Sequence, residues 1–589
     1  MNISAISHRC AYTDSYPLDK DTLCLNIKTA YDVDSVYVIW HDPASFRKTE
    51  DGPWRGGKVQ MEKKFCLKNH IIWTCTVQPP FKRTEYYFEL HGKENDETWL
   101  CFENDFALPS EFAANPEIYL QYKNAWLNPN DVVSVPSWVK DTVWYQIMPD
   151  RFCSAGNFPK RYKNRDWNDT VNMDWRDFFG GDLPGVTSKL DYLKDLGISG
   201  IYFTPIFKSS SNHKYNTEDY SLIDPDFGSD QDMKTLVEEA HKRGIRIMLD
   251  AVFNHSGGDF PYWLDVVENG EKSKYKDWFF VNKLPLKGVQ GDTSDGRYFS
   301  FDFVPMMPKL NTNNPEVQDY LINICRHWVK EWNIDAIRFD VANEISHDFV
   351  KVLRRNLCKE NPNLFLLGEI WTDSFQWLAG DEYHSVMNYP FMIAIGKTFA
   401  HSGELKHEMD KVYSLYYRQT NTALFNFLDT HDTGRAIDAC KNIDEFYQKL
   451  LLLMTMEGTP CIFYGTEIAL EGASGPYNRS PMPWDQLEKP ERKEVLSKVK
   501  EIIALRNEHP ALRAEKIQYI PLENRDQVLF KRSSDDGKEN IFVALNLSEE
   551  DMEIPFEKGQ KLLFGINASL SEGKEEKLLL KKDACALFI

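Results

Sequence analysis

Helix-like and strand-like segments alternate through the middle of the chain, and this alternation constrains the fold more than any other feature. Eight short apolar runs have the pattern of buried strands, and most follow an amphipathic helix. The expected strands are 143–148, 198–204, 245–252, 334–339, 364–367, 384–389, 423–427 and 460–464. This repeat predicts a (β/α)8 TIM barrel. The alternative is an open doubly wound sheet, but no GxGxxG motif follows the first strand.

Helix-ending signals support the same assignment. The expected helices are 187–196, 233–243, 315–332, 348–360 and 444–457. Gly197, Gly244 and Gly458 follow three of them, where glycine commonly ends a helix. Pro315 stands at the start of another, a position that tolerates proline. Each helix therefore leads directly into a strand.

Segments outside the alternation predict further domains. Residues 1–123 contain strand-like runs between polar turns, which indicates an N-terminal β-sandwich. The barrel is expected over 124–500, with a subdomain inserted after its third strand at about 256–311, where no clean strand–helix unit is seen. From about residue 501 the pattern returns to strands and predicts a C-terminal β-sandwich over 501–589.

Charge and composition exclude several classes of partner. The net charge of −20 argues against nucleic acid and against anionic membrane surfaces, but it does not argue against a neutral substrate. The N-terminus has no signal-peptide pattern, and no apolar run is long enough to span a membrane. We therefore expect a cytoplasmic protein. The 11 cysteines are scattered without CxxC spacing and are expected to be reduced thiols.

Charged and polar side chains follow four of the expected strands. They are Asp250, Asn254 and His255 after the third, Arg338 and Asp340 at the fourth, Glu369 and Trp371 after the fifth, and His431 and Asp432 after the seventh. The carboxyl ends of barrel strands converge on one face, so these side chains are expected to share one pocket. Gathering like charges costs folding energy, which favours a functional over a purely structural explanation.

Converging carboxylates suit two chemistries. One is a metal site, but two imidazoles and an arginine fit a neutral substrate better than a hard cation. The other is cleavage of a glycosidic bond, which needs one ionised carboxylate and one carboxyl group that donates a proton. Arg338 is expected to keep Asp340 ionised. Glu369 follows an apolar run, with Trp371 nearby, and is the expected general acid–base.

Four ordered motifs resemble those of the α-amylase family, glycoside hydrolase family 13. They are Asp250-Ala-Val-Phe-Asn-His255, Ile337-Arg-Phe-Asp340, Gly368-Glu-Ile-Trp371 and Leu428-Asp-Thr-His-Asp432. The segments Met307-Pro-Lys-Leu-Asn311 and Val341-Ala-Asn-Glu344 are similar to those of the neopullulanase, cyclomaltodextrinase and maltogenic amylase group. The resemblance extends over nearly the whole chain.

The resemblance implies a retaining mechanism on α-glucan oligosaccharides, with the two reacting carboxyl groups about 5 Å apart. Asp340 would be the nucleophile, Glu369 the acid–base and Asp432 a brace for the distorted sugar. The implied substrate contacts are Tyr215, His255, Arg338, His431, Trp371, Glu344 and Arg479, with Asp250 and Asn254 in support. The expected activity is cleavage of α-1,4 bonds in cyclomaltodextrins and maltooligosaccharides, with pullulan cleavage and glycosyl transfer as extensions.

Three departures from the family pattern concern substrate and metal contacts. Asn216 stands where the group usually has Asp, and the segment that begins at Gly475 begins with Asp in relatives. The loop 153–160 lacks the Asn and Asp series that binds calcium in relatives, and Thr466 replaces a common Asp. We therefore expect no metal ligands and no required cofactor; the resemblance raises structural calcium, but the sequence does not support it.

Two other activities and an assembly state complete the expectations. An α-glucosidase or another glucan-active member of the family is the first alternative. A non-catalytic glucan-binding protein is the second, and it is disfavoured because all three catalytic carboxylates are present. By analogy with relatives, a homodimer is expected, formed through the N-terminal domain.

Overall fold

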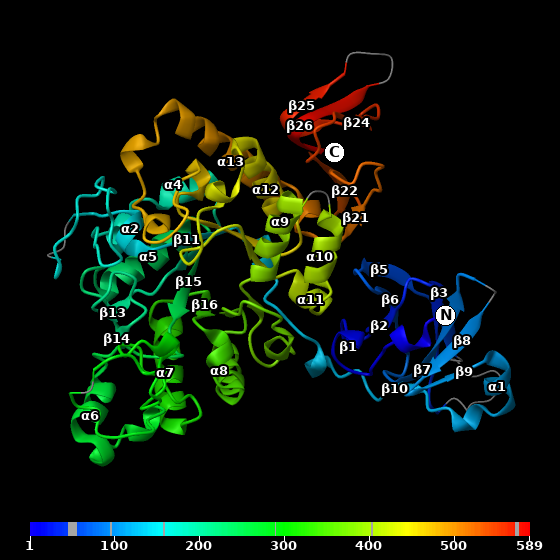
Figure 1. The fold of residues 1–589 in the computed structure, drawn as a ribbon, viewed down its shortest axis with the longest axis horizontal. Coiled ribbons are helices and arrows are strands. Elements are labelled where there is room, and N and C mark those ends of the chain that lie inside the picture. The colour runs from blue at the N-terminus through cyan, green and yellow to red at the C-terminus, as the bar shows by residue number, and fades with distance from the viewer. Residues whose placement is uncertain (45–55, 95–96, 157–159, 289, 402–403, 572–575) are drawn as a thin grey trace. The chain divides into compact units, whose positions relative to one another are not determined.

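The structure is a computed structural model, and it describes residues 1–44, 56–94, 97–156, 160–288, 290–401, 404–571 and 576–589. The chain forms two compact units. Unit 1 comprises Met1–Ser134, Leu378–Gly380 and Glu404–Asn421, and unit 2 comprises Val135–Trp377, Asp381–Gly403 and Thr422–Ile589. Figure 1 shows the elements of both units along the chain. Within the described residues, no helix combines the length and apolar character needed to cross a lipid bilayer.

The N-terminal part of unit 1 is a sandwich of two antiparallel sheets. One sheet has the order β1-β2-β6-β5 and the other β4-β3-β7-β8-β9, with β10 paired to β7. The strands are β1 (Ser15–Pro17), β2 (Leu23–Thr29), β3 (Val33–His41), β4 (Gly57–Gln60), β5 (Glu62–Cys66), β6 (Ile71–Val77), β7 (Thr84–Gly92), β8 (Thr98–Phe102), β9 (Asp105–Ala107) and β10 (Tyr122–Asn124). Alternate residues of β7 are buried, and both sheets contribute to one apolar core. The predicted N-terminal sandwich is confirmed.

A segment from the middle of the chain belongs to this same unit. It contains α10 (Leu405–Tyr413) and α11 (Arg418–Asn421). The Asp410 carboxylate accepts a hydrogen bond of 2.8 Å from the Cys66 backbone N–H at the end of β5. The Gln419 side chain donates to the carbonyl oxygen of Pro17 at 3.0 Å. These contacts complete the polar edges of the first sheet.

Eight parallel strands form the barrel of unit 2. The strands are β11 (Trp144–Ile147), β12 (Gly200–Phe203), β15 (Arg246–Ala251), β16 (Ala336–Phe339), β17 (Phe365–Gly368), β18 (Ser385–Val386), β19 (Phe425–Phe427) and β20 (Thr459–Phe463). Their order is β18-β17-β16-β15-β12-β11-β20-β19, and a parallel bridge between Met387 and Phe425 joins the two outer strands. The sheet therefore closes, which confirms the barrel and rejects the open sheet.

Helices alternate with these strands as predicted (Figure 1). The helices of unit 2 are α2 (Pro149–Phe152), α3 (Leu183–Thr187), α4 (Leu190–Leu196), α5 (Asp230–Lys242), α6 (Pro261–Asn269), α7 (Pro315–Glu331), α8 (His347–Glu360), α9 (Tyr389–His401), α12 (Ile443–Thr455) and α13 (Pro490–Glu508). Gly197 ends α4 with φ of 92°, a left-handed conformation that suits glycine. The sequence did not predict α2, α3, α6, α9 or α13.

Two insertions at the carboxyl ends of strands build the wall of the site. The hairpin β13 (Phe207–Ser209) and β14 (Thr217–Ile223) follows β12. The predicted subdomain follows β15 and contains α6. Short antiparallel bridges hold it together, including His255 with Lys309 and Phe279 with Leu310.

A six-stranded antiparallel sheet forms the C-terminal part. Its strands are β21 (Ile517–Tyr519), β22 (Gln527–Ser533), β23 (Asn540–Asn546), β24 (Met552–Pro555), β25 (Leu562–Leu570) and β26 (Lys577–Phe588), and β26 pairs with β23, β24 and β25. The prediction of strands from about residue 501 was too early, because α13 continues to Glu508. The Gln448 side chain of α12 donates to the carbonyl oxygens of Asn546 and Ala584, which ties this sheet to the barrel.

Candidate active site

One large cavity lies at the carboxyl ends of the barrel strands. Its volume is about 1280 Å³. The predicted residues that line it are Tyr215, His255, Asp340, Glu369, Trp371, Asp432 and Arg479. Strands β15, β16, β17 and β19, the β13–β14 hairpin and the segment after β20 all contribute. Five of the nine side chains that the strand-end prediction placed in one pocket line this cavity, and Asp250, Asn254, Arg338 and His431 do not. Tyr215 and Arg479 were expected from the family resemblance.

Strand register brings the central carboxylates together. In the parallel ladder, Asp250 of β15 stands opposite Arg338 of β16. The ladder continues one step past the strands, because the Asp340 N–H donates to the Ala251 carbonyl at 3.1 Å and the Glu369 N–H donates to the Phe339 carbonyl at 2.9 Å. Asp340, the candidate nucleophile, and Glu369, the candidate acid–base, are therefore the first residues after the neighbouring strands β16 and β17.

Arg338 is fully buried and contacts three carboxylates. Its Nη1 donates to both carboxylate oxygens of Asp250 at 2.8 Å and to Asp340 Oδ1 at 2.9 Å. Its Nη2 lies 2.8 Å from Glu369 Oε2. One guanidinium therefore fixes three acidic groups, and charge-assisted contacts of this length are strong where water is excluded.

The charges at this centre do not balance. Asp250, Asp340, Glu369 and Asp432 share the two guanidinium groups of Arg338 and Arg479. Burial raises the pKa of Asp250 to about 6, although Arg338 opposes the shift. Burial also raises the pKa of Asp340, and its carboxylate neighbours add to the effect of burial. The expectation that Arg338 alone keeps Asp340 ionised is therefore too simple, and the centre is suited to retaining a proton.

Tyr215 and His431 extend the network by hydrogen bonds. Gln146 of β11 donates its amide N–H to His431 Nδ1 at 2.7 Å, which leaves the ring proton on Nε2. His431 Nε2 lies 2.6 Å from the Tyr215 hydroxyl, which in turn donates to Asp250 at 3.0 Å. Burial lowers the pKa of His431 well below its ordinary value, so the imidazole is neutral at pH 7. The sequence analysis missed Gln146. An amide side chain inside an otherwise apolar strand is the feature that could have identified it.

His255 has a free hydrogen-bonding atom in the cavity wall. The side chain is buried, and its ring stacks on Phe301 with centroids 5.0 Å apart. Its Nε2 has no hydrogen-bond partner among the described residues. A buried polar atom of this kind is costly unless a ligand completes it. This arrangement fits the predicted sugar contact.

The Asn254 side chain is buried and does not line the cavity. Its amide oxygen accepts a hydrogen bond from Lys309, whose Nζ also pairs with Glu344 Oε2 at 3.0 Å. The structure does not bring Glu344 to the cavity wall; its neighbour Asn343 lines the cavity instead. Lys309 therefore connects the inserted subdomain to two strand-end loops. Asn254 takes the supporting position expected for it.

Two aromatic side chains hold Glu369. Trp371 Nε1 donates to Glu369 Oε1 at 3.2 Å, and the Tyr389 hydroxyl donates to the same oxygen at 3.4 Å. The two rings stack with centroids 3.8 Å apart. Trp371 is 48% exposed and offers an aromatic face to the cavity.

Arg479 orients the remaining carboxylate. Its Nη2 donates to Asp432 Oδ1 at 3.0 Å, and its Nε donates to the carbonyl oxygen of His431 at 2.8 Å. Partial burial raises the pKa of Asp432, and Arg479 opposes the shift. Other lining residues that the sequence analysis did not select are Trp175, Arg176, Phe178, Asn212, His213 and Phe301.

Departures from the family pattern have structural consequences. The Asn216 side chain is buried and accepts hydrogen bonds from the Ser209 and Ser211 hydroxyl groups, so it holds the turn of the hairpin rather than lining the cavity. The Thr466 hydroxyl donates to the buried Asp429 carboxylate at 2.9 Å. Both side chains therefore have structural partners.

Cationic side chains neutralise the buried acids near the loop 153–160, of which residues 157–159 lie outside the described residues. Lys160 pairs with Asp182 at 3.2 Å, and Arg161 pairs with Asp224 at 2.6 Å. An ammonium and a guanidinium therefore supply positive charge beside these carboxylates. The absence of a calcium requirement stays an expectation from the sequence.

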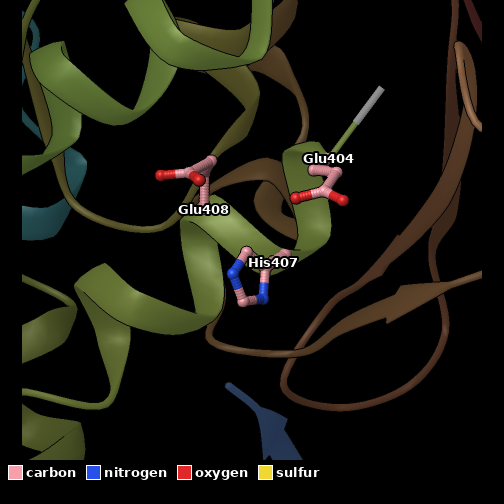
Figure 2. Close-up of side chains that lie close together, drawn as sticks. All are labelled: Glu404, His407 and Glu408. Atoms are coloured by element: carbon pink, nitrogen blue, oxygen red, sulfur yellow. The ribbon is translucent and has the colours of Figure 1, made fainter. Parts of the chain in front are cut away.

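Within the described part of the chain, one group of side chains has ligand atoms close enough to share a metal ion. Glu404, His407 and Glu408 lie on or beside α10, with ligand atoms within 4.8 Å of one another (Figure 2). Glu408 is already paired with Lys411 at 2.5 Å. These residues do not line the cavity, and we assign them no part in its chemistry.

Comparisons with known proteins agree with this architecture. The family model described as "Alpha amylase, catalytic domain" matches residues 146–505. The family model described as "Alpha amylase, N-terminal ig-like domain" matches residues 1–122. An intracellular maltogenic amylase of Bacillus subtilis is 40% identical over 544 residues, which is 91% of this chain and 90% of that relative. Neopullulanase 2 of Thermoactinomyces vulgaris is 35% identical over 592 residues, 98% of each chain.

A solved structure gives the same result. A cyclomaltodextrinase superposes with a TM-score of 0.89 at 36% identity, and the match covers 100% of both chains. A barrel with carboxylates gathered at its strand ends, together with these matches, defines a glycoside hydrolase. The chain belongs to the α-amylase family.

Proposed function

We propose that this protein is a retaining hydrolase that cleaves α-1,4-glucosidic bonds in cyclomaltodextrins and maltooligosaccharides, with pullulan cleavage and glycosyl transfer as secondary activities. One observation carries the proposal: the buried Arg338 contacts Asp340 and Glu369 at once, in a cavity that Asp432 also lines. Relatives named cyclomaltodextrinase, maltogenic amylase and neopullulanase support this substrate class.

The reaction begins with transfer of the glycosyl group to the protein. An Asp340 oxygen attacks the anomeric carbon while the bond to the leaving oxygen breaks, and Glu369 gives that oxygen a proton. A β-linked glycosyl ester and the shortened glucan result. The contact of both carboxyl groups with one guanidinium supports the short separation, about 5 Å, that this double displacement needs.

Water completes the reaction in a second displacement. Glu369, now ionised, removes a proton from water, and the water oxygen attacks the same carbon and releases Asp340. The product keeps the α configuration. When a sugar hydroxyl replaces water as the acceptor, the same step forms a new glycosidic bond.

Neutral hydrogen-bonding groups are the proposed partners of the sugar before the scissile bond. His255 Nε2, which lacks a partner among the described residues, is suited to one of its hydroxyl groups. His431 is the second proposed contact, through Nε2, which lies 2.6 Å from the Tyr215 hydroxyl in this structure. Asp432 braces the distorted ring, and Tyr215 forms an apolar face below it. Trp371 contacts the sugar after the scissile bond.

Two substitutions test the catalytic assignment. Asp340→Ala and Glu369→Gln are expected to lose at least about a thousandfold in kcat on β-cyclodextrin, because each removes a group that forms or breaks a bond. Sodium azide should restore turnover to Asp340→Ala as a β-glycosyl azide. Substantial activity in either variant without azide would defeat the assignment. Asp410→Asn, a buried acid in unit 1, is the matched control.

Product analysis separates the proposal from its rivals. Chromatography of β-cyclodextrin digests should give largely maltose. Glucose as the main early product would favour an α-glucosidase. Tight glucan binding without turnover in the unmodified protein would favour a non-catalytic binding protein.

Assembly and location are further parts of the proposal. We propose a homodimer formed through the N-terminal domain, which sedimentation at micromolar concentration tests; a lone 68.6 kDa particle would contradict it. We also propose a cytoplasmic location, supported by the name of the intracellular relative. Fluorescent fusion or cell fractionation checks this assignment.

A further inference from the structure

Trp175 is a large apolar side chain exposed in the cavity wall. It lies in the loop between α2 and α3 and lines the cavity beside Arg479. The residue is 53% exposed, although burial of an indole ring is strongly favourable. An exposed tryptophan in a cavity offers a flat apolar surface that the proposed catalytic steps do not use.

The indole ring packs against Gly475, where only glycine leaves room for it. A Cβ atom at residue 475 would lie 1.8 Å from the Cη2 atom of Trp175, so any larger residue there must displace the ring. The Arg479 guanidinium lies 5.1 Å from the ring centroid, within the range of a cation–π contact. Gly475 and Arg479 therefore both pack against the ring.

The backbone beneath the ring is also fixed. The buried Asn212 side chain donates to the carbonyl oxygen of Trp175 at 2.7 Å and to that of Asp177 at 2.8 Å. Arg151 donates to the same Asp177 oxygen at 2.7 Å. A surface held at both its ring and its backbone loses little conformational entropy when a ligand binds.

We propose that Trp175 is the stacking platform for a second glucose residue, one step farther toward the non-reducing end than the residue that Asp432 holds. Arg479 links the two positions, because it pairs with Asp432 at 3.0 Å and contacts the indole ring. A glucose ring in a glucan presents an apolar face that an indole ring can cover. This inference rests on the proposed function, since it assigns Asp432 to the sugar that is cleaved.

The platform accounts for Gly475. Any side chain at residue 475 would need the space that the indole ring of Trp175 fills. Here the side chain is absent and Trp175 occupies its space. The chain thus binds the second glucose through an apolar face.

The distribution of cleavage sites in maltotriose tests the platform. With a label at the reducing end, occupation of the second site releases labelled glucose, whereas its loss favours labelled maltose. Trp175→Ala is expected to lower the initial ratio of labelled glucose to labelled maltose about tenfold, and Trp175→Phe should retain most of it. Gly475→Ala should lower the ratio as well, because its Cβ displaces the ring. Trp126→Ala, a tryptophan of similar exposure in unit 1, should leave it unchanged.

A ratio within twofold of the unmodified protein in Trp175→Ala would overturn the proposal. The ratio is independent of total rate, so a general loss of folding or catalysis does not imitate the expected result. Maltose affinity measured by calorimetry is the second readout and needs no turnover; about tenfold weaker binding in Trp175→Ala supports the platform, and unchanged binding overturns it. Absence of maltotriose hydrolysis by the unmodified protein would instead refute the proposed function.

Discussion

Replacement of Arg338 by methionine tests the electrostatic design of the site. Methionine keeps much of the side-chain length but removes the charge that three carboxylates share. Removing one partner of a buried ion pair costs about 3–5 kcal/mol, because the other partner stays buried without compensation. We expect Arg338→Met to lower the free energy of unfolding by about 4 kcal/mol at pH 7.

The loss should shrink as the pH falls. Burial already raises the pKa of Asp250 to about 6 and raises that of Asp340 in the intact protein. Without the guanidinium both values move farther above those of the unfolded chain, so the folded variant binds more protons than the unfolded one. Its stability therefore rises on acidification relative to the parent protein. A difference of about 2.7 kcal/mol between pH 7 and pH 5 corresponds to uptake of one proton.

Urea unfolding followed by circular dichroism at pH 7 and pH 5 measures both quantities. Arg338→Lys is the matched control, since it keeps a charge but cannot bridge three carboxylates, and it should lose an intermediate amount. A loss below about 1 kcal/mol at pH 7, or an equal loss at both pH values, would refute the argument from shared charge. Turnover of β-cyclodextrin should be abolished in Arg338→Met in either case.

Three further substitutions test separate features. His255→Gln should make the stability of the protein less sensitive to acid. Burial lowers the pKa of His255 to about 3, so the parent protein loses about 1.4 kcal/mol of unfolding free energy per pH unit below 6.5 through this residue. Urea unfolding at pH 6.5 and pH 5 should show that the parent loses about 2 kcal/mol more than the variant. Val341→Gly should raise stability by up to about 1 kcal/mol, since Val341 has φ of 45°, and should leave kcat close to that of the parent, since glycine keeps the backbone N–H that donates to Glu369 at 3.0 Å; a lower Tm would contradict this. Gly181→Ala should destabilise by about 1–3 kcal/mol in urea unfolding, because its Cβ would lie 1.9 Å from the backbone oxygen of Pro149; unchanged stability would contradict the contact.

The barrel was predictable because its strands are buried on both faces. Strands such as β16 and β17 have every residue buried, so they stand out as short apolar runs between polar turns. The site was predictable for the same reason, since charged residues such as Asp340 and Glu369 directly follow these runs. Local sequence is sufficient to predict a site residue where that residue directly follows a buried strand.

Other features depend on partners that are distant in the sequence. Gln146 acquires its role only when β11 pairs with β20 and reaches His431. The Trp175 ring occupies its position in the cavity wall only because Gly475, which has no Cβ, packs against it. Glu344 was expected to contact substrate from its motif, but Lys309 of the inserted subdomain binds it elsewhere. Sequence patterns do not report which distant segment fills a given space.

The mid-chain segment in unit 1 has a consequence for synthesis on the ribosome. The first sheet emerges early, but its Cys66 N–H and the Pro17 carbonyl bond to residues that are translated after most of the barrel. The N-terminal domain therefore reaches its finished form only once Asn421 has left the exit tunnel. A nascent chain halted before that point should carry a protease-sensitive first domain, although every one of its own strands has already been made.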